Sequence, residues 1–290
     1  MSRLPIPREI STAAGIRVWS ADHRAAGRRV GFVPTMGYLH EGHLRLVDAA
    51  RAVSDVVVMS IFVNPLQFGP GEDLARYPRD LPRDRELAAS RGVDALFLPD
   101  AAMMYPPGSE TRVTPGPAAD RWEGEVRPGH FAGVLTVVAK LFHLVMPDVA
   151  VFGQKDAQQA ALIRAMVRDL DWPIALVVAP TAREEDGLAL SSRNGYLSAA
   201  ERAEAVGLSR ALRAAHDLWR RGETEAARLE AAARVTLQMF PAVRPEYIAV
   251  VEPDALAPAV SAGAGCLMVI AARIGSTRLI DNVIFGEGVP

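Results

Sequence analysis

The sequence predicts an α/β protein whose main domain contains a parallel sheet covered by helices on both faces. Two observations support this class: short apolar runs rich in β-branched residues, and longer segments between them with apolar residues at helical spacing. Strands that alternate with helices form parallel sheets buried on both faces. Ligands of such sheets bind beyond the carboxyl ends of the strands, so the segment after each strand is a candidate site.

The expected elements follow one another through the first 180 or so residues. Apolar runs predict strands at Val30–Val33, Val56–Val63, Ala95–Leu98, Val149–Phe152 and Ile174–Val178. Helical spacing predicts helices at Leu44–Ala52, Asp84–Arg91, Phe131–Val145 and Ala157–Leu170. Within its helix, Asp84 has the spacing of a surface charge.

After about residue 181 the pattern changes, which predicts a catalytic domain at residues 1–181 and a smaller α+β domain at residues 182–290. A long helix is expected at Ser198–Arg221, because Ser198 and Glu201 have the spacing of a capping box. The other expected elements are a helix at about Glu223–Phe240, strands at Tyr247–Val251 and Leu267–Ile274, and a hinge at Pro180–Asn194.

Composition and charge exclude several classes of protein. The net charge of the 290 residues is −2, so no general basic field would attract nucleic acid, and an anionic ligand needs a local site. A single cysteine, Cys266, fits a reducing compartment. No uncharged apolar run of 18 residues and no signal-peptide stretch occur. We therefore expect a cytoplasmic globular protein without a membrane segment or a nucleic-acid partner.

The first candidate site is the turn Pro34–His43, with the sequence PTMGYLHEGH, between the first strand and the next helix. Gly37 and Gly42 allow the backbone to approach a ligand, and a helix N-terminus offers N–H groups to phosphate. His40 and His43 stand three residues apart, so both can face one ligand and stabilise developing charge as imidazolium donors. A metal pair and two structural histidines are the alternatives.

The second candidate site is Asn64–Phe68, at the carboxyl end of the second strand. Asn64 and Gln67 are neutral amides, which can donate to a carboxylate and accept from a hydroxyl. A polar turn that begins with Asn-Pro explains the same residues without a ligand.

Two later segments carry cations. Gly153–Asp156 follows a strand, which puts the mobile ammonium of Lys155 where phosphates would lie, although Asp156 there could also simply cap a helix. In Leu190–Asn194, two hydroxyls and a guanidinium can hold a triphosphate, whereas loop composition alone accounts for them equally well. His130 in RPGHF fits either a loop contact or a helix cap.

Taken together and in this order, these motifs resemble the pantoate–β-alanine ligase family. The match runs from Gly31 to Asn282 and includes PTMGYLHEGH, FVNPLQF, RPGHFAGV, FGQKDAQQ and LSSRNGYLS. The resemblance implies a Rossmann-like nucleotidyltransferase domain, a smaller lid-like C-terminal domain and a homodimer. It also implies that ATP and (R)-pantoate form pantoyl adenylate with Mg²⁺, and that β-alanine then gives pantothenate and AMP.

The resemblance also implies roles for individual residues. Catalytic donors would be His40, His43, Lys155 and Arg193. ATP would be bound by Pro34, Thr35, Met36, Gly37, Tyr38, Leu39, His40, Glu41, Gly42, His43, Gly153, Gln154, Lys155, Asp156, Ala182, Leu190, Ser191, Ser192 and Arg193. Pantoate would be bound by Met36, Asn64, Gln67 and Gln159, and β-alanine by Gln67. No side chain is implied as a metal ligand, because ATP phosphates would hold Mg²⁺.

Two positions depart from the family pattern, and two other functions compete with this one. Leu190 stands where methionine is common, and Gln154 where many members have glutamate. The competing functions are adenylyl transfer to a phosphate and nucleotide binding without catalysis. The two substrate amides argue against the first, since a phosphate dianion favours arginine or lysine.

Overall fold

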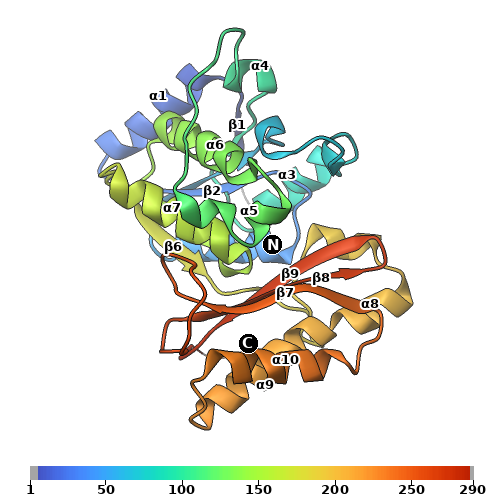
Figure 1. The fold of residues 1–290 in the computed structure, drawn as a ribbon. Helices are drawn as coiled ribbons and strands as arrows, with labels where there is room; N and C mark the ends of the chain where they lie inside the picture. Colours follow the sequence, from blue (N-terminus) through green and yellow to red (C-terminus); the bar gives the residue numbers. More distant parts are fainter. Residues whose placement is uncertain (1–5, 288–290) are drawn as a thin grey trace. The chain divides into compact units, whose positions relative to one another are not determined.

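The structure is a computed structural model that describes residues 6–287, apart from the side chain of Asp73. Residues 1–5 and 288–290, at the outer ends of the two expected domains, lie outside the described residues. The chain forms two compact units (Figure 1). The first contains Met1–Gly153 and Leu162–Ala179, and the second contains Gln154–Ala161 and Pro180–Pro290.

The first unit contains a six-stranded parallel sheet with the order β1-β4-β3-β2-β5-β6. All five strands expected there are confirmed, and β1 is the one that the apolar pattern missed. The strands are β1 (Arg8–Ile10), β2 (Val30–Thr35), β3 (Val56–Ile61), β4 (Ala95–Phe97), β5 (Val149–Gly153) and β6 (Ala175–Ala179).

Both faces of this sheet are buried, as its apolar runs predict. In β3, Val56 and Val58 join the apolar cluster on one face, whereas Val57 and Met59 join the cluster on the other. Helices α1, α6 and α7 contribute to the first cluster, and α2 and α3 to the second. The helices are α1 (Ala13–Ala25), α2 (Glu41–Arg51), α3 (Leu81–Ser90), α4 (Ala101–Met104), α5 (Glu123–Val126), α6 (His130–Val145) and α7 (Ala157–Asp169), of which residues 157–161 belong to the second unit.

The strand order reverses between β2 and β5. From β2 the chain proceeds to β3 and β4 on one side, whereas β5 and β6 lie on the other side. Phe32 pairs with Ala150 in parallel register, so β2 and β5 end at the same edge of the sheet. In open α/β sheets this reversal point is where ligands bind, which directs attention to the segments after Thr35 and Gly153.

The second unit is the smaller α+β domain that the sequence predicts. Its sheet is antiparallel with the order β7-β8-β9, and α9 and α10 lie side by side against it (Figure 1). The third strand, β9, was not expected from the sequence. The elements are α8 (Ala199–Ala205), α9 (Gly207–Arg220), α10 (Ala226–Leu237), β7 (Val243–Val251), β8 (Leu267–Ile274) and β9 (Thr277–Ile284).

One helix expected in this unit is divided in the structure. The Ser198 capping box with Glu201 is confirmed, but the single helix over Ser198–Arg221 is wrong, because α8 ends at Ala205 and α9 begins at Gly207. A Cβ atom at Gly207 would lie 2.6 Å from Cγ of Phe240, so the glycine is what lets this ring pack against the junction. No helix within residues 6–287 is long and apolar enough to span a membrane.

Candidate active site

The turn after β2 takes a conformation that needs glycine. Gly37 has a φ of 84°, in the left-handed region, and a Cβ atom there would lie 2.8 Å from Cγ2 of Ile61. The Thr35 hydroxyl accepts a hydrogen bond from the Gly37 N–H (3.2 Å) and donates to the carbonyl of Ser60 (2.7 Å). Met36–Leu39 therefore forms a fixed turn between β2 and α2.

A carboxylate from α3 holds the same turn. Asp84, which the sequence assigned to the surface, is only 1% exposed, so that assignment was wrong. Its oxygens accept from the backbone N–H groups of Tyr38 (2.9 Å) and Leu39 (2.7 Å). Asp84 is buried together with Ala88, one turn further along α3, because this face of the helix packs on the sheet unit.

The two histidines of the turn cap α2. Nδ1 of His40 accepts from the Gly42 N–H (3.2 Å), and Nδ1 of His43 accepts from the His40 N–H (3.3 Å). The ring centroids are 4.1 Å apart. Since both Nδ1 atoms are acceptors, a neutral ring carries its proton on Nε2. Each ring is thus arranged as a neutral Nε2–H donor, which differs from the imidazolium donors that we expected.

The two amides expected to bind substrate contact each other and the turn. Nδ2 of the buried Asn64 donates to Oε1 of Gln67 (3.0 Å) and to the carbonyl of Gly133 (3.1 Å). Burial raises the pKa of Tyr105 to about 12, and its protonated hydroxyl donates to Oδ1 of Asn64 (2.8 Å). Nε2 of Gln67 donates to the thioether of Met36 (3.2 Å), which is a weak acceptor.

A charged cluster of Glu72, Arg127 and His130 contacts the backbone carbonyl of Gln67, and the sequence did not identify it as part of the site. Arg127 forms a two-pronged ion pair with Glu72 (2.8 and 2.6 Å), and its hydrogen bonds hold the pKa of Glu72 below the usual value. Arg127 also donates to Nε2 of His130 (3.0 Å), so Nδ1–H of His130 donates to the Gln67 carbonyl (2.8 Å). Burial, followed by the charge of Arg127, lowers the pKa of His130. The RPGHF motif, which contains both Arg127 and His130, is the sequence feature that could have indicated this cluster.

In the second unit, β9 holds the segment that follows β5. Nδ2 of Asn282 donates to the backbone carbonyls of Gln154 (2.9 Å) and Lys155 (3.0 Å). The Gln154 amide donates back to Oδ1 of Asn282 (2.8 Å), an interaction that a glutamate at position 154 could not make. Nζ of Lys155 lies 3.5 Å from Oδ1 of Asp156, the limit of a weak contact. Lys155 is thereby fixed through its backbone, while its ammonium is held only loosely.

The neighbouring residue of β9 holds the loop that contains Ala182 and Leu190. The N–H of Leu190 donates to the carbonyl of Ala182 (2.8 Å), so the loop closes on itself. Arg183 forms a two-pronged ion pair with Asp281 (2.6 and 2.9 Å), and the two side chains are 8% and 3% exposed. Removal of either partner would leave a buried charge uncompensated.

Four other predicted site residues lie in the second unit: Gln159, Ser191, Ser192 and Arg193. The Ser191 hydroxyl accepts from the Arg193 N–H (3.2 Å) and caps the short helix Ser192–Tyr196. On α7, Gln158 is buried, whereas Gln159 is half-buried and forms no side-chain hydrogen bond with a described residue. Gln159 is therefore the glutamine of this pair that can serve a ligand.

The predicted residues thus form two sets. In the first unit, Met36, Asn64 and Gln67 are joined by hydrogen bonds, next to the turn that carries the histidines. In the second unit, the Gln154–Asp156 segment and the Ala182–Arg193 loop are both attached to β9. Chain continuity links the sets, because Gln154 directly follows Gly153 at the end of β5.

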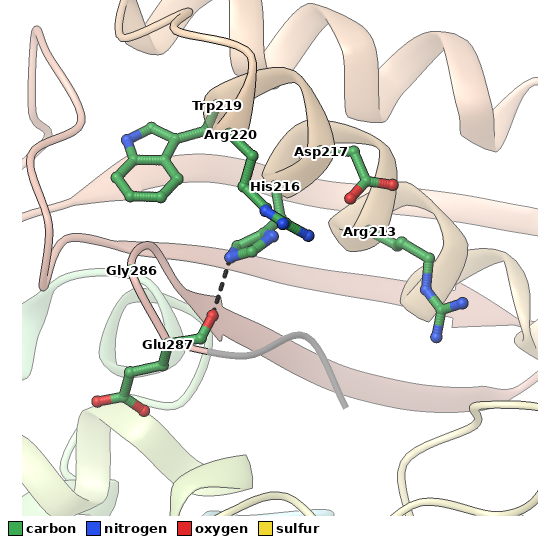
Figure 2. Close-up of a pocket in the computed structure, with 7 residues that line it drawn as sticks. All are labelled: Arg213, His216, Asp217, Trp219, Arg220, Gly286 and Glu287. Carbon is green, nitrogen blue, oxygen red and sulfur yellow. Dashed lines mark hydrogen bonds between the residues drawn. The ribbon is translucent and has the colours of Figure 1, made fainter.

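The described residues also contain a feature outside these sets. An open pocket of about 580 Å³ lies in the second unit, and two of its lining residues are joined by a hydrogen bond from Nε2 of His216 to the Glu287 carbonyl (2.9 Å; Figure 2). No predicted site residue lines it. Its lining residues are Arg213, His216, Asp217, Trp219, Arg220, Gly286 and Glu287. Within residues 6–287 no three His, Cys, Asp or Glu side chains are grouped as metal ligands would be.

Comparison with known proteins identifies the family. The model of the pantoate–β-alanine ligase family matches residues 8–284, which is nearly the whole chain. The chain belongs to this family. The family predicted from the sequence motifs is confirmed, as are the α/β fold class and the assignment as a pantoate–β-alanine ligase enzyme.

Relatives and solved structures agree with the family. The chain is 53% identical to a pantothenate synthetase of Moorella thermoacetica over 275 residues, which cover 95% of this chain and 97% of that protein. It matches the crystal structure of pantothenate synthetase from Thermus thermophilus with a TM-score of 0.89 and 52% identity, covering 96% and 99% of the chains. A third match is the Francisella tularensis ligase complexed with beta-gamma ATP and beta-alanine (TM-score 0.77, 32% identity, 98% and 100% covered).

Proposed function

We propose that this chain joins pantoate to β-alanine through an acyl adenylate. A pantoate carboxylate oxygen attacks the α-phosphorus of ATP, and the bond to pyrophosphate breaks. The β-alanine amine then attacks the carbonyl carbon, the bond to AMP breaks, and the nitrogen loses a proton. The observation that carries this proposal is the edge shared by β2 and β5, because each strand is followed there by groups suited to phosphate.

For ATP, we propose binding by the turn after β2 and by the segments held on β9. The N-terminus of α2 offers N–H groups and positive potential to phosphate, and His40 and His43 offer Nε2–H donors there. Lys155 and Arg193 add cations that neutralise the triphosphate. The complex of the Francisella tularensis ligase with beta-gamma ATP supports the use of ATP. The full proposed set is the one given above, residues 34–43, 153–156, 182 and 190–193.

For pantoate, we propose binding by Met36, Asn64, Gln67 and Gln159. The Gln67 amide now donates to a thioether, and a carboxylate or hydroxyl oxygen is a stronger acceptor that would take its place. Gln159 has no competing side-chain partner among the described residues. We also assign a β-alanine contact to Gln67, which the beta-alanine complex of the Francisella tularensis ligase makes testable.

The protein's part in this chemistry is alignment and charge stabilisation. The route needs no covalent enzyme nucleophile, since adenylation itself gives the carboxylate a good leaving group. Neutral amides orient pantoate, and cationic and N–H donors stabilise charge that develops on the phosphate oxygens. Mg²⁺ would be held through the ATP phosphates and would neutralise part of their charge. We further propose a cytoplasmic homodimer, a lid role for residues 182–290, and no nucleic-acid partner.

Isotope exchange tests this proposal directly. Labelled pyrophosphate should enter ATP when pantoate is present and β-alanine is absent, because the first half-reaction is reversible and needs no amine. Exchange that requires β-alanine would contradict a free adenylate intermediate. Exchange that appears with a phosphate acceptor instead of pantoate would support the competing adenylyl transfer to phosphate.

Replacement of Gln67 by alanine should chiefly weaken pantoate binding. The substitution removes the amide that we assign to pantoate, and a lost neutral hydrogen bond costs about 0.5–1.5 kcal/mol, or about two- to tenfold in KM. Initial rates at varied pantoate measure the effect. Gln238→Ala, at the exposed end of α10, is the matched control. A pantoate KM that stays at the wild-type value in Gln67→Ala would refute the assignment.

A further inference from the structure

The Asp84 carboxylate is satisfied entirely by the turn after β2. Its two oxygens accept from consecutive backbone N–H groups, those of Tyr38 (2.9 Å) and Leu39 (2.7 Å). No lysine, arginine or hydroxyl of the described residues pairs with it, although it is 1% exposed. A buried carboxylate without a cation is costly unless charge-assisted hydrogen bonds compensate it, so this contact is specific.

The turn itself needs such a contact. Gly37 and Tyr38 have φ values of 84° and 52°, and the left-handed region is unfavourable for a tyrosine by about 1–2 kcal/mol. In this turn the Gly37 N–H donates to the Thr35 hydroxyl, whereas the consecutive N–H groups of Tyr38 and Leu39 converge on one carboxylate, as successive backbone N–H groups do at an anion site. At Gly37 a Cβ atom would lie 2.9 Å from Oδ2 of Asp84, so the carboxylate also occupies the space under the turn.

We propose that Asp84 is a positioning residue for ATP, which acts by holding the turn that sets the start of α2. Leu39, whose N–H it binds, is followed directly by His40, the residue that caps α2 and accepts the helix N–H groups. A shift of this turn would move the His40 and His43 rings together. The inference rests on the proposed function, because the role of these rings toward ATP is part of that proposal.

Helix α3 contains its own control for this inference. Asp80 caps α3, and its side chain accepts from the Arg83 N–H (3.2 Å) within the same helix. Substitution of Asp80 perturbs the stability of α3 but leaves both bonds to the turn intact. If Asp84 served only to stabilise α3, the two substitutions would have the same effect.

Amide hydrogen exchange of the ligand-free wild-type protein tests the contact without any mutation. The Tyr38 and Leu39 amides should exchange slowly, as buried hydrogen-bonded amides do, although neither belongs to a helix or strand. Exchange at the rate of an open loop would overturn the inference. This outcome is independent of ATP, so it is separate from failure of the proposed function, which the pyrophosphate exchange decides.

Kinetics of Asp84→Asn test the consequence for ATP. An asparagine keeps one acceptor but turns an NH₂ group toward the second backbone N–H. The KM for ATP should rise about tenfold or more, as for a lost charge-assisted hydrogen bond, with a smaller change in the KM for pantoate. Asp80→Asn should leave the ATP KM at the wild-type value. Equal rises in both KM values, or a folded Asp84→Asn enzyme with the wild-type ATP KM, would overturn the inference.

Discussion

Lys155→Ala should lower the rate of pantoate-dependent pyrophosphate exchange at least ~10²-fold, the low end for loss of an electrostatic donor to a transition state. The backbone of Lys155 should stay in place, because Asn282 binds the carbonyls of Gln154 and Lys155 and not the ammonium. The measured loss would therefore report on the charge alone. Kinetic constants for exchange, together with a folding check by circular dichroism, give the result.

The comparison with other cations sharpens this experiment. Arg168→Ala removes a guanidinium that is 65% exposed at the far end of α7, and it should leave the exchange rate unchanged. Lys155→Arg keeps the charge but replaces a compact ammonium by a planar fork, so it should restore only part of the rate. Near-normal exchange in Lys155→Ala would exclude a catalytic role for this lysine.

The sheet of the first unit could be predicted because its strands are buried on both faces. Val56–Ile61 is apolar at almost every position, so the strand can be recognised from its own residues without knowing which strands pair with it. β9 was missed for the opposite reason. Its run is interrupted by Asp281 and Asn282, which are both 4% exposed and bind the loop and the segment that we assign to ATP. Buried polar residues of functional sites break the pattern on which strand prediction depends.

Asp84 shows a second limit of reading a sequence. Helical spacing places it on the same face as Ala88, but a charge on a helix usually faces water. Its partners, Tyr38 and Leu39, lie some 45 residues away and bind through backbone N–H groups, which no side-chain motif records. The residues of the turn could therefore be identified from their amino-acid types, whereas the role of Asp84 in holding the turn could be seen only in the structure.

The histidines illustrate what geometry adds to a motif. Their spacing predicted that both rings face one ligand, but the capping bonds of α2 decide which nitrogen can donate. Nδ1 of His43 accepts from the His40 N–H, so the nitrogen that can donate to a phosphate oxygen is Nε2. A single substitution to alanine removes both nitrogens and cannot separate capping from catalysis.

His43→Asn and His43→Gln separate the two roles. The Asn oxygen can take the place of Nδ1 and preserve the cap, whereas the Gln amide nitrogen can take the place of Nε2 and preserve the donor. We expect His43→Ala and His43→Asn to lower pantoate-dependent pyrophosphate exchange at least ~10²-fold, and His43→Gln to retain part of the rate. His143→Ala, at an exposed ring on α6, should not change it.

The ranking of these variants decides between the two roles of His43. If capping were its main contribution, His43→Asn would be the most active variant, because loss of a helix cap costs about 1 kcal/mol of stability and a preserved cap costs little. If the Nε2–H donor stabilises the transition state, His43→Asn should be folded and inactive, with a thermal midpoint close to that of the wild type. Only the second result agrees with the proposed adenylation, because the exchange rate then depends on the Nε2–H donor to phosphate and not on the helix cap.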